Sequence, residues 1–391
     1  NLFINGSGVT NKQKIENYAV FGSVEYALTD QLTLKASGRY TQSKNRANIC
    51  GYTIENGNVD KLFNLLGGLL GTVPFTPVGV AGCYTLNENN VPGQPFIRTL
   101  KEDNFSFRAG VDYQVTPETL LYANISRGYK AGSFPSLAAA VYAGLEPVTQ
   151  ESVTAYEGGV KTQLLDRRVS LTAAAFYYDY RDKQIRGKIF DPLFGNLDAL
   201  INVPKARIYG AEADVTVRPL DGLTINGALT YLNSKIQEGP SAPRNYNILG
   251  VQDEFAGDPL PFTPKWSGTV NVDYRGKTAN GGTPLIGVSI NARSGADAAP
   301  GARRIAYAPA GDAQVVVLRD GVTYPFAIKG YATVDGRVGY EAPDGAWRVM
   351  LWGKNIFNRY YWTTVIPSND SAARFAGRPV TYGVTVAFKV N

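Results

Sequence analysis

The chain has 391 residues, of which 44% are hydrophobic and 18% are charged, and its formal net charge is +6. This charge is small for the length, and the Lys and Arg residues are dispersed among carboxylates, which argues against a nucleic-acid-binding surface. The sequence contains no His, which excludes hydrolases with a histidine base and disfavours haem held by a histidine. No linker or shift in composition divides the chain, so we expect one continuous architecture.

Alternation of apolar and polar residues is the main pattern along the chain. In an early segment, Leu32, Leu34 and Ala36 alternate with polar residues, and this period of two indicates a strand with one apolar face. About thirteen such segments run to roughly 10 residues or more, which is the length of a tilted membrane-spanning strand. Clear examples are residues 32–40, 105–114, 208–217 and 380–390.

The connections between these segments alternate between short and long. The short ones are rich in residues that favour tight reversals and lie at residues 28–31, 116–119, 166–168, 219–222, 275–282 and 342–345. The long ones lie at residues 43–103, 131–151, 187–201, 236–264, 294–329 and 363–376. Short turns at one rim and long loops at the other are typical of bacterial outer-membrane barrels. We therefore predict an all-β, transmembrane, antiparallel up-and-down β-barrel with short periplasmic turns and long extracellular loops.

A soluble β-sandwich or a propeller would also show alternating segments. Sandwich strands typically have only about 5 to 6 residues, and their long loops are not confined to one rim. No repeat of blade length is visible, which argues against a propeller. The apolar run from Leu62 to Val73 is shorter than the roughly 20 residues of a membrane helix and lies within a predicted loop. The membrane barrel is therefore the preferred interpretation.

The two cysteines of the chain, Cys50 and Cys83, both lie in the longest predicted loop. In an oxidising compartment they are expected to form a disulfide that constrains this loop, and the alternative is two free thiols. Metal binding by the pair is disfavoured because the chain has no His and no CxxC spacing.

Charged residues recur on the polar face of the predicted strands. They include Arg108, Glu157, Lys161, Glu212, Asp214, Arg337 and Arg348. Paired carboxylates such as Glu212 and Asp214 occur in glycosidases, but at positions i and i+2 of one strand face they are more consistent with a charge lattice in a water-filled lumen. We therefore expect no enzymatic activity, no resident cofactor and no bound structural metal.

Several stretches, taken together and in this order, resemble the carboxyl-terminal barrel of TonB-dependent outer-membrane receptors. They are SRGYKAGSF (126–134), VTQESVTAYEGGVK (148–161), NVPKARIYGAEADV (202–215), LWGKNIFNRYYW (351–362) and RPVTYGVTVAFKV (378–390). The resemblance implies a 22-stranded barrel that is gated by a plug domain and powered through the TonB–ExbB–ExbD energy-coupling complex. The charged residues of the polar face would then contact the plug, and the apolar face would contact outer-membrane lipid and lipopolysaccharide.

The number of segments departs from the family pattern. A barrel of this family begins and ends on the periplasmic side, whereas the first segment here leads from the long-loop side into a short turn. An odd number of strands cannot close a bacterial outer-membrane barrel. We therefore expect residues 1–391 to be the carboxyl-terminal portion of the receptor barrel, with the plug domain and the first strands absent from this sequence.

Aromatic and basic residues gather toward the long-loop rim, where a ligand would first meet the receptor. They are Tyr129, Lys130 and Phe134, then Tyr178, Tyr180, Arg181 and Arg186, and finally Tyr360, Tyr361, Trp362 and Arg374. Iron-loaded siderophores are commonly anionic, and aromatic faces and guanidinium groups suit such ligands. The hypothesis is TonB-dependent import of a ferric siderophore. Uptake of carbohydrate or cobalamin, a passive pore and a soluble binding module are the alternatives.

Overall fold

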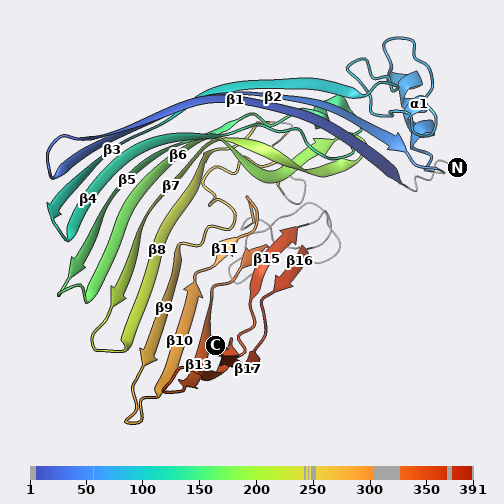
Figure 1. The fold of residues 1–391 in the computed structure, drawn as a ribbon. Coiled ribbons are helices and arrows are strands. Elements are labelled where there is room, and N and C mark those ends of the chain that lie inside the picture. Colours follow the sequence, from blue (N-terminus) through green and yellow to red (C-terminus); the bar gives the residue numbers. More distant parts are fainter. Residues whose placement is uncertain are drawn as a thin grey trace.

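The computed structural model describes residues 6–55, 57–241, 244, 246–247, 252–302, 326–367 and 372–389. These residues form a 13-stranded antiparallel sheet in which each strand pairs with its neighbours in chain order (Figure 1). Its strands are β1 (Ser7–Ala27), β2 (Leu32–Thr53), β3 (Phe96–Thr116), β4 (Thr119–Lys130), β5 (Glu151–Leu164), β6 (Val169–Asp191), β7 (Gly195–Val217), β8 (Leu223–Glu238), β9 (Trp266–Arg275), β10 (Thr283–Arg293), β13 (Tyr331–Glu341), β14 (Trp347–Lys354) and β17 (Thr381–Phe388). The predicted up-and-down all-β architecture is confirmed.

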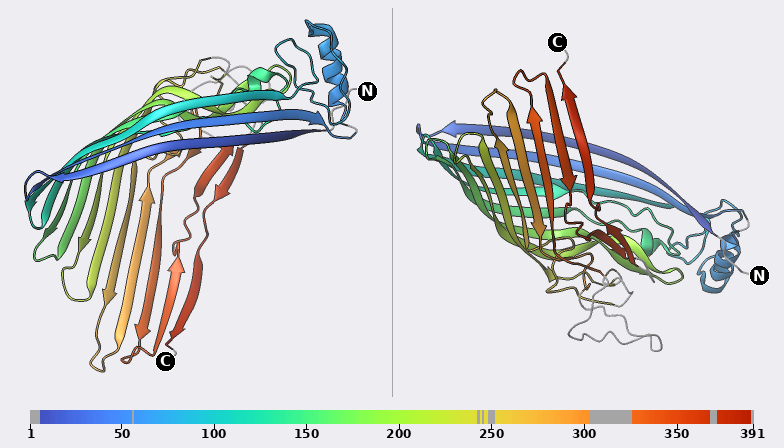
Figure 2. Two further views of the ribbon diagram at one scale, coloured as in Figure 1. Left: turned by 45° about the horizontal axis from the view of Figure 1, so that its top comes forward. Right: turned by 90° about the horizontal axis from the view of Figure 1, so that it is seen from below.

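The sheet is strongly curved and twisted, as two further views show (Figure 2). In the described residues β1 and β17 form its two edges. All six predicted short turns join consecutive strands at one rim, and each spans only the residues between the strand bounds given above. Long connections leave the opposite rim except between β6 and β7, so the alternation of short and long connections is confirmed at every other position.

The strand register separates an apolar face from a polar face. Ile286 of β10 pairs with Val338 of β13, Val338 with Leu351 of β14, and Leu351 with Val384 of β17. These four side chains form a row across four strands, and each is between 51% and 62% exposed. A continuous apolar band of this kind would be unfavourable in water and is suited to hydrocarbon. The next row of the same strands contains Arg337, which lies on the polar face.

Two predicted long connections are shorter than the sequence indicated. The predicted loop at 43–103 is wrong at both ends because β2 continues to Thr53 and β3 begins at Phe96, so Cys50 lies in a strand. The predicted connection at 187–201 is also wrong, since β6 and β7 extend into it and leave only residues 192–194 between them. These extensions carry polar residues on both faces or are covered by loops, so they lack the apolar alternation of a lipid-facing strand.

Smaller elements occupy the long-loop rim. They are the helix α1 (Val59–Leu70), the 3-10 turn η1 (Tyr142–Leu145), the two-stranded ribbon of β11 (Ala296–Asp297) and β12 (Ala327–Ile328), and the hairpin of β15 (Trp362–Pro367) and β16 (Ala372–Ala376). Among the described residues, none of the helices has the length and apolar character needed to cross a bilayer. The apolar run predicted to be too short for a membrane helix forms most of α1, which buries Val59 and Phe63.

The buried core lies beneath the loops at this rim. One cluster contains Ile185, Ile201 and Val203 of the β6–β7 hairpin together with Phe255 and Leu260 from the β8–β9 loop. A second contains Phe326 and Ile328 packed on Val365 of β15. Because burial of apolar area is the main stabilising force available to these loops, the clusters give the rim a defined shape.

Candidate ligand-binding site at the long-loop rim

The tip of the β6–β7 hairpin, residues 182–204, is held by the β4–β5 loop, residues 131–150. Asp191 is almost fully buried, and its carboxylate accepts hydrogen bonds from the backbone amides of Ala140 at 2.7 Å, Phe194 at 2.9 Å and Leu193 at 3.0 Å. Asn202 accepts a hydrogen bond from the amide of Thr149 at 2.9 Å and donates to its carbonyl at 3.0 Å. A buried carboxylate that accepts hydrogen bonds from several backbone amides favours a single arrangement of the segments around it. We call residues 131–150 and 182–204 together the first loop wall.

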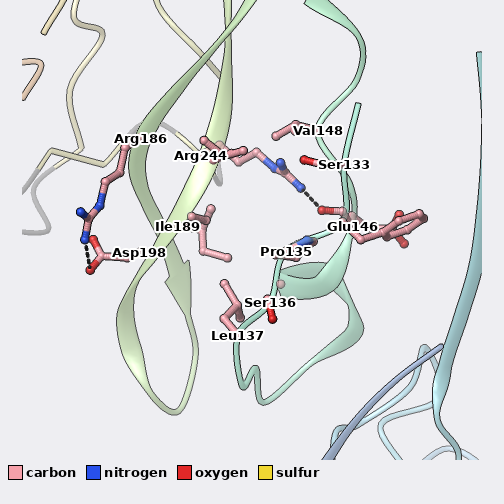
Figure 3. A pocket seen from close by; sticks show the side chains of 14 residues that line it. Ser133, Pro135, Ser136, Leu137, Glu146, Val148, Arg186, Ile189, Asp198 and Arg244 are labelled. Carbon is pink, nitrogen blue, oxygen red and sulfur yellow. Dashed lines mark hydrogen bonds and ion pairs between the residues drawn. The ribbon is translucent and has the colours of Figure 1, made fainter. Parts of the chain in front are cut away.

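The first loop wall encloses a cavity of about 320 Å³ (Figure 3). We call it the Arg244 cavity. Arg244 Nη2 donates to the backbone carbonyl of Glu146 at 2.8 Å, and Ile189 and Leu137 supply apolar lining. Burial lowers the pKa of the Arg244 guanidinium, while the nearby Glu146 carboxylate opposes that effect. The guanidinium retains its charge because its ordinary pKa is so high, and this places a cation in a largely apolar cavity.

A larger cavity of about 550 Å³ lies between the β6–β7 hairpin and the more carboxyl-terminal loops. We call it the Lys188 cavity. Its apolar lining comes from the β8–β9 loop, from the segment after β11 and from β15, and includes Phe255, Leu260, Pro300 and Val365. Tyr246 also lines it. Apolar and aromatic surfaces with a few convergent charges are the usual features of a small-molecule site.

An ion-pair group lies on the β6–β7 hairpin, which lines both cavities. Asp198 of β7 pairs through Oδ2 with Arg186 Nη2 at 3.2 Å and through Oδ1 with Lys188 Nζ at 3.1 Å. The Lys188 side chain is only 4% exposed, whereas those of Arg186 and Asp198 are 54% and 44% exposed. Arg186 and Asp198 line both cavities, and Figure 3 shows their pair at the edge of the Arg244 cavity.

The structure separates the residues that the sequence predicted for ligand binding. Phe134 lines the Arg244 cavity, although its ring is 5% exposed and packs at 6.2 Å from that of Phe96. Tyr178 lies on the polar face and stacks on Phe176 at 4.8 Å, and Lys183 Nζ lies 4.2 Å from the Tyr180 ring centroid. These residues lie close to the cavities, which is compatible with a role in binding. That role stays a prediction.

Other predicted residues lie farther from these two cavities. Arg181 pairs with Asp179 at 3.2 Å and lines neither of them. The Tyr129 ring lies 5.3 Å below the Arg127 guanidinium, and Lys130 faces Glu151 across the β4–β5 pair. Trp362 and Arg374 contact each other on the β15–β16 hairpin, with the guanidinium 4.3 Å from the ring centroid. Sequence reasoning missed Lys188, Asp198 and Arg244, which have no neighbouring motif and meet only through the fold.

The predicted charged residues of the polar face form two separate groups. Arg108, Glu157 and Lys161 line a cavity of about 400 Å³ on the first strands, beside a Lys35–Asp112 ion pair of 2.9 Å. Farther along the sheet Arg337 pairs with Asp273, and Arg348 lies 4.0 Å from Glu341. Glu212 and Asp214 lie between the groups on β7, where they face Ala174 and Thr172 of β6. Contact of these residues with a plug remains a prediction.

The predicted disulfide between Cys50 and Cys83 is confirmed, with a Cα–Cα distance of 5.2 Å. It ties the end of β2 to the loop that follows α1. That loop contacts the first loop wall, because the amide of Leu86 donates to the carbonyl of Ala140 at 2.9 Å and the amide of Tyr142 donates to the carbonyl of Leu86 at 3.0 Å. In the described residues, no group of three or more His, Cys, Asp or Glu side chains is placed to hold a metal ion.

A curved antiparallel sheet with an apolar outer band, a charged second face and loops gathered at one rim is the architecture of an outer-membrane barrel. Residues 3–356 match the family described as TonB dependent receptor-like, beta-barrel, and the chain belongs to this family. Members of this family are barrels of the Gram-negative outer membrane. The polar face is therefore the lumen face.

The chain is similar to known receptors in sequence. The ferric-pyoverdine M114 receptor PbuA of Pseudomonas sp. (strain M114) is 27% identical over 246 residues, which are 62% of this chain and 24% of that protein. The metal-pseudopaline receptor CntO of Pseudomonas aeruginosa is 30% identical over 144 residues, which are 37% of this chain and 19% of that protein. The chain therefore spans only about a quarter of the curated relatives it matches.

Solved structures share the fold at lower identity. The ferric yersiniabactin uptake receptor FyuA of Yersinia pestis has a TM-score of 0.67 at 17% identity, with 97% of this chain and 46% of that chain covered. The ferric-catecholate import receptor Fiu of Escherichia coli K12, in its closed form, has a TM-score of 0.62 at 17% identity, with 96% and 45% covered. These similarities show that nearly the whole chain shares the fold of these solved structures.

Proposed function

We propose that this chain is the carboxyl-terminal portion of the barrel of a receptor that imports a ferric siderophore across the outer membrane. Import would be powered by the TonB–ExbB–ExbD complex acting on a plug domain. The observation that carries the proposal is the family match, in which relatives are named as receptors for ferric pyoverdine and for metal-pseudopaline. An import function also accords with the rim, where two cavities combine apolar lining with cations.

The lumen face supports the proposed plug contact. Arg108, Glu157 and Lys161 border a polar cavity that a plug side chain would fill. Exposed ion pairs each contribute only about 0 to 1 kcal/mol. Many such pairs together would hold a plug in place, and because each is weak they could be broken one after another when the plug is pulled. A water-filled pore without a plug would also carry charged residues on its inner face. The plug contact is therefore part of what we propose.

A second candidate cargo is a chelate of another metal. One relative is named as a receptor for metal-pseudopaline, without restriction to iron. The excess of cations lining the Lys188 cavity would attract the anionic chelator whichever metal it holds, since the protein would contact the organic ligand first. Carbohydrate or cobalamin remains a further alternative cargo, and the uptake experiment below separates the three.

Uptake of labelled chelates by intact cells tests the proposal. Cells that express the intact receptor should accumulate radiolabelled iron from a panel of ferric siderophores, and deletion of TonB should abolish the accumulation. The same panel loaded with nickel, zinc or cobalt tests the second candidate. Accumulation of labelled cobalamin or oligosaccharide instead of iron, or accumulation that does not depend on TonB, would overturn the proposed function.

A further inference from the structure

The charges that line the Lys188 cavity are unequal. Of its described lining residues, Lys183, Arg186 and Lys188 are cations, and Asp198 is the one carboxylate. Lys183 is also paired with Glu151, at 3.1 Å. Arg186 and Lys188 therefore converge on a single carboxylate in a cavity whose other lining is mostly apolar and aromatic.

The three members of this ion-pair group differ in their freedom to move. Lys188 is nearly buried and lies directly opposite Asp198 in the β6–β7 ladder, with its ammonium 3.1 Å from that carboxylate. Arg186 reaches the same carboxylate diagonally and has more than half of its side chain exposed. A guanidinium can bind a second anion by a side-chain rotation and retains its charge throughout.

We infer that the Lys188 cavity binds the anionic part of the chelate, and that Asp198 sets the charge selectivity of the receptor. An incoming catecholate or carboxylate oxygen takes Arg186 as its partner, while Asp198 stays with Lys188. Asp198 thus weakens the binding of anions and offsets part of the positive charge of the empty site. The inference rests on the proposed import function and adds the ligand's charge class and the residues that recognise it.

A purely structural role for the group makes a different prediction. Cross-strand ion pairs can simply stabilise a hairpin. In that case, removing Asp198 or Arg186 would loosen the hairpin tip and would weaken the binding of every ligand, whatever its charge. Electrostatic selection instead requires the two substitutions to act in opposite directions on an anionic ligand.

The test compares two ferric chelates of opposite charge on the purified intact receptor. Ferric enterobactin is a tris-catecholate trianion, and ferrioxamine B is a tris-hydroxamate cation. Equilibrium binding of the radiolabelled chelates is measured for the wild type, Arg186→Gln and Asp198→Asn. Arg186→Gln should weaken binding of the anion about tenfold and Asp198→Asn should strengthen it by a similar factor, with the cation unchanged or shifted the opposite way.

Matched controls come from the opposite rim. Glu341 is shared by two cations as Asp198 is, since Arg275 lies 3.3 Å and Arg348 lies 4.0 Å from it. Glu341→Gln and Arg275→Gln should leave both affinities within a factor of two of the wild type. If Asp198→Asn does not fold, Arg186→Gln decides alone, because Arg186 is half exposed and its loss leaves the Lys188–Asp198 pair in place.

Equal shifts for both chelates, or no shift in either variant, would overturn the inference. It is also overturned if the wild type prefers the cation or binds neither chelate. None of these results would contradict iron import itself, which the TonB-dependent uptake of other siderophores decides separately.

Discussion

The two walls that flank the Lys188 cavity are held together by different forces. In the first loop wall, the Asp191 carboxylate and the Asn202 amide bind backbone groups of the β4–β5 loop directly. The second loop wall consists of the β11–β12 ribbon and the β15–β16 hairpin, and Phe326 and Ile328 pack on Val365 where these two parts meet. Both walls bury apolar side chains, and the first is distinguished by the hydrogen bonds that Asp191 and Asn202 make between its two segments.

This difference suggests which wall can adapt to a ligand. Hydrogen bonds to a buried carboxylate are lost in steps and favour a single arrangement, whereas apolar side chains can repack at modest cost. We therefore expect the first loop wall to present the charged groups in fixed positions and the second to adjust to the ligand's shape. Four changes test the comparison, from the largest expected effect to the smallest.

Phe326→Ala removes the largest buried side chain of the second loop wall. Truncation of a buried Phe typically costs about 3 to 5 kcal/mol because apolar contacts are lost and a cavity forms. Hydrogen exchange of the β15 and β16 amides in the intact receptor should therefore accelerate by more than a hundredfold. Phe375→Ala on the same hairpin is the control, because that ring is 48% exposed and its loss should change exchange little. Equal acceleration in both variants would show that burial at Phe326 does not hold this wall.

Replacement of Cys50 and Cys83 by Ser removes the covalent tie next to the first loop wall. The bond links residues 33 positions apart, and on the chain-entropy model such a closure contributes roughly 3 to 4 kcal/mol. Thermolysin should cleave the loop between β2 and β3 much faster in the double variant than in the wild type. Wild-type receptor treated with reductant should behave like the variant, and unchanged cleavage would contradict the proposed constraint.

Asp191→Ala leaves three backbone amides of the first loop wall without their carboxylate partner. Unsatisfied buried donors cost about 1 to 3 kcal/mol each, and entry of water would reduce the total to about 3 kcal/mol. Exchange at Ala140 and Phe194 should rise sharply while exchange in β15 and β16 stays unchanged. Asp179→Ala on the same strand removes an exposed ion pair with Arg181 and should have little effect. A matching loss of protection in the second loop wall would show that the walls are not independent.

High pH should loosen the first loop wall through Tyr142. Burial raises the pKa of the Tyr142 phenol to about 12 from an ordinary value near 10, and the hydroxyl donates to the carbonyl of Gln94 at 2.9 Å. The folded loop therefore favours the neutral phenol, so its stability is complete below pH 10 and declines as the pH rises from 10 toward 12. Ultraviolet titration of the phenolates should show a late phase whose amplitude falls by one phenol in Tyr142→Phe, since burial raises the pKa of Tyr84 as well. Titration of that phenol near 10 would contradict its burial.

Sequence alone determined the strands of the sheet apart from their ends at the long-loop rim, the two faces of these strands and the turns at the short rim. Residues that alternate with a period of two place Val338 and Leu351 on one face and Arg337 on the other, because successive side chains of a strand point to opposite sides. The disulfide was also predictable, since a chain with two cysteines has only one pairing. For the ligand site, sequence indicated the rim and the aromatic and basic residue types.

Only the tertiary structure decided which charges meet at the rim. Asp191 binds the amide of a residue 51 positions away, and Arg186 pairs with Asp198 across a hairpin that the sequence suggested was a loose connection. Side-chain contacts of this kind repeat with no period and depend on how loops cover a hairpin, so no local pattern encodes them. The first loop wall and the charge selectivity of the Lys188 cavity therefore arise from packing between segments that are distant in the chain.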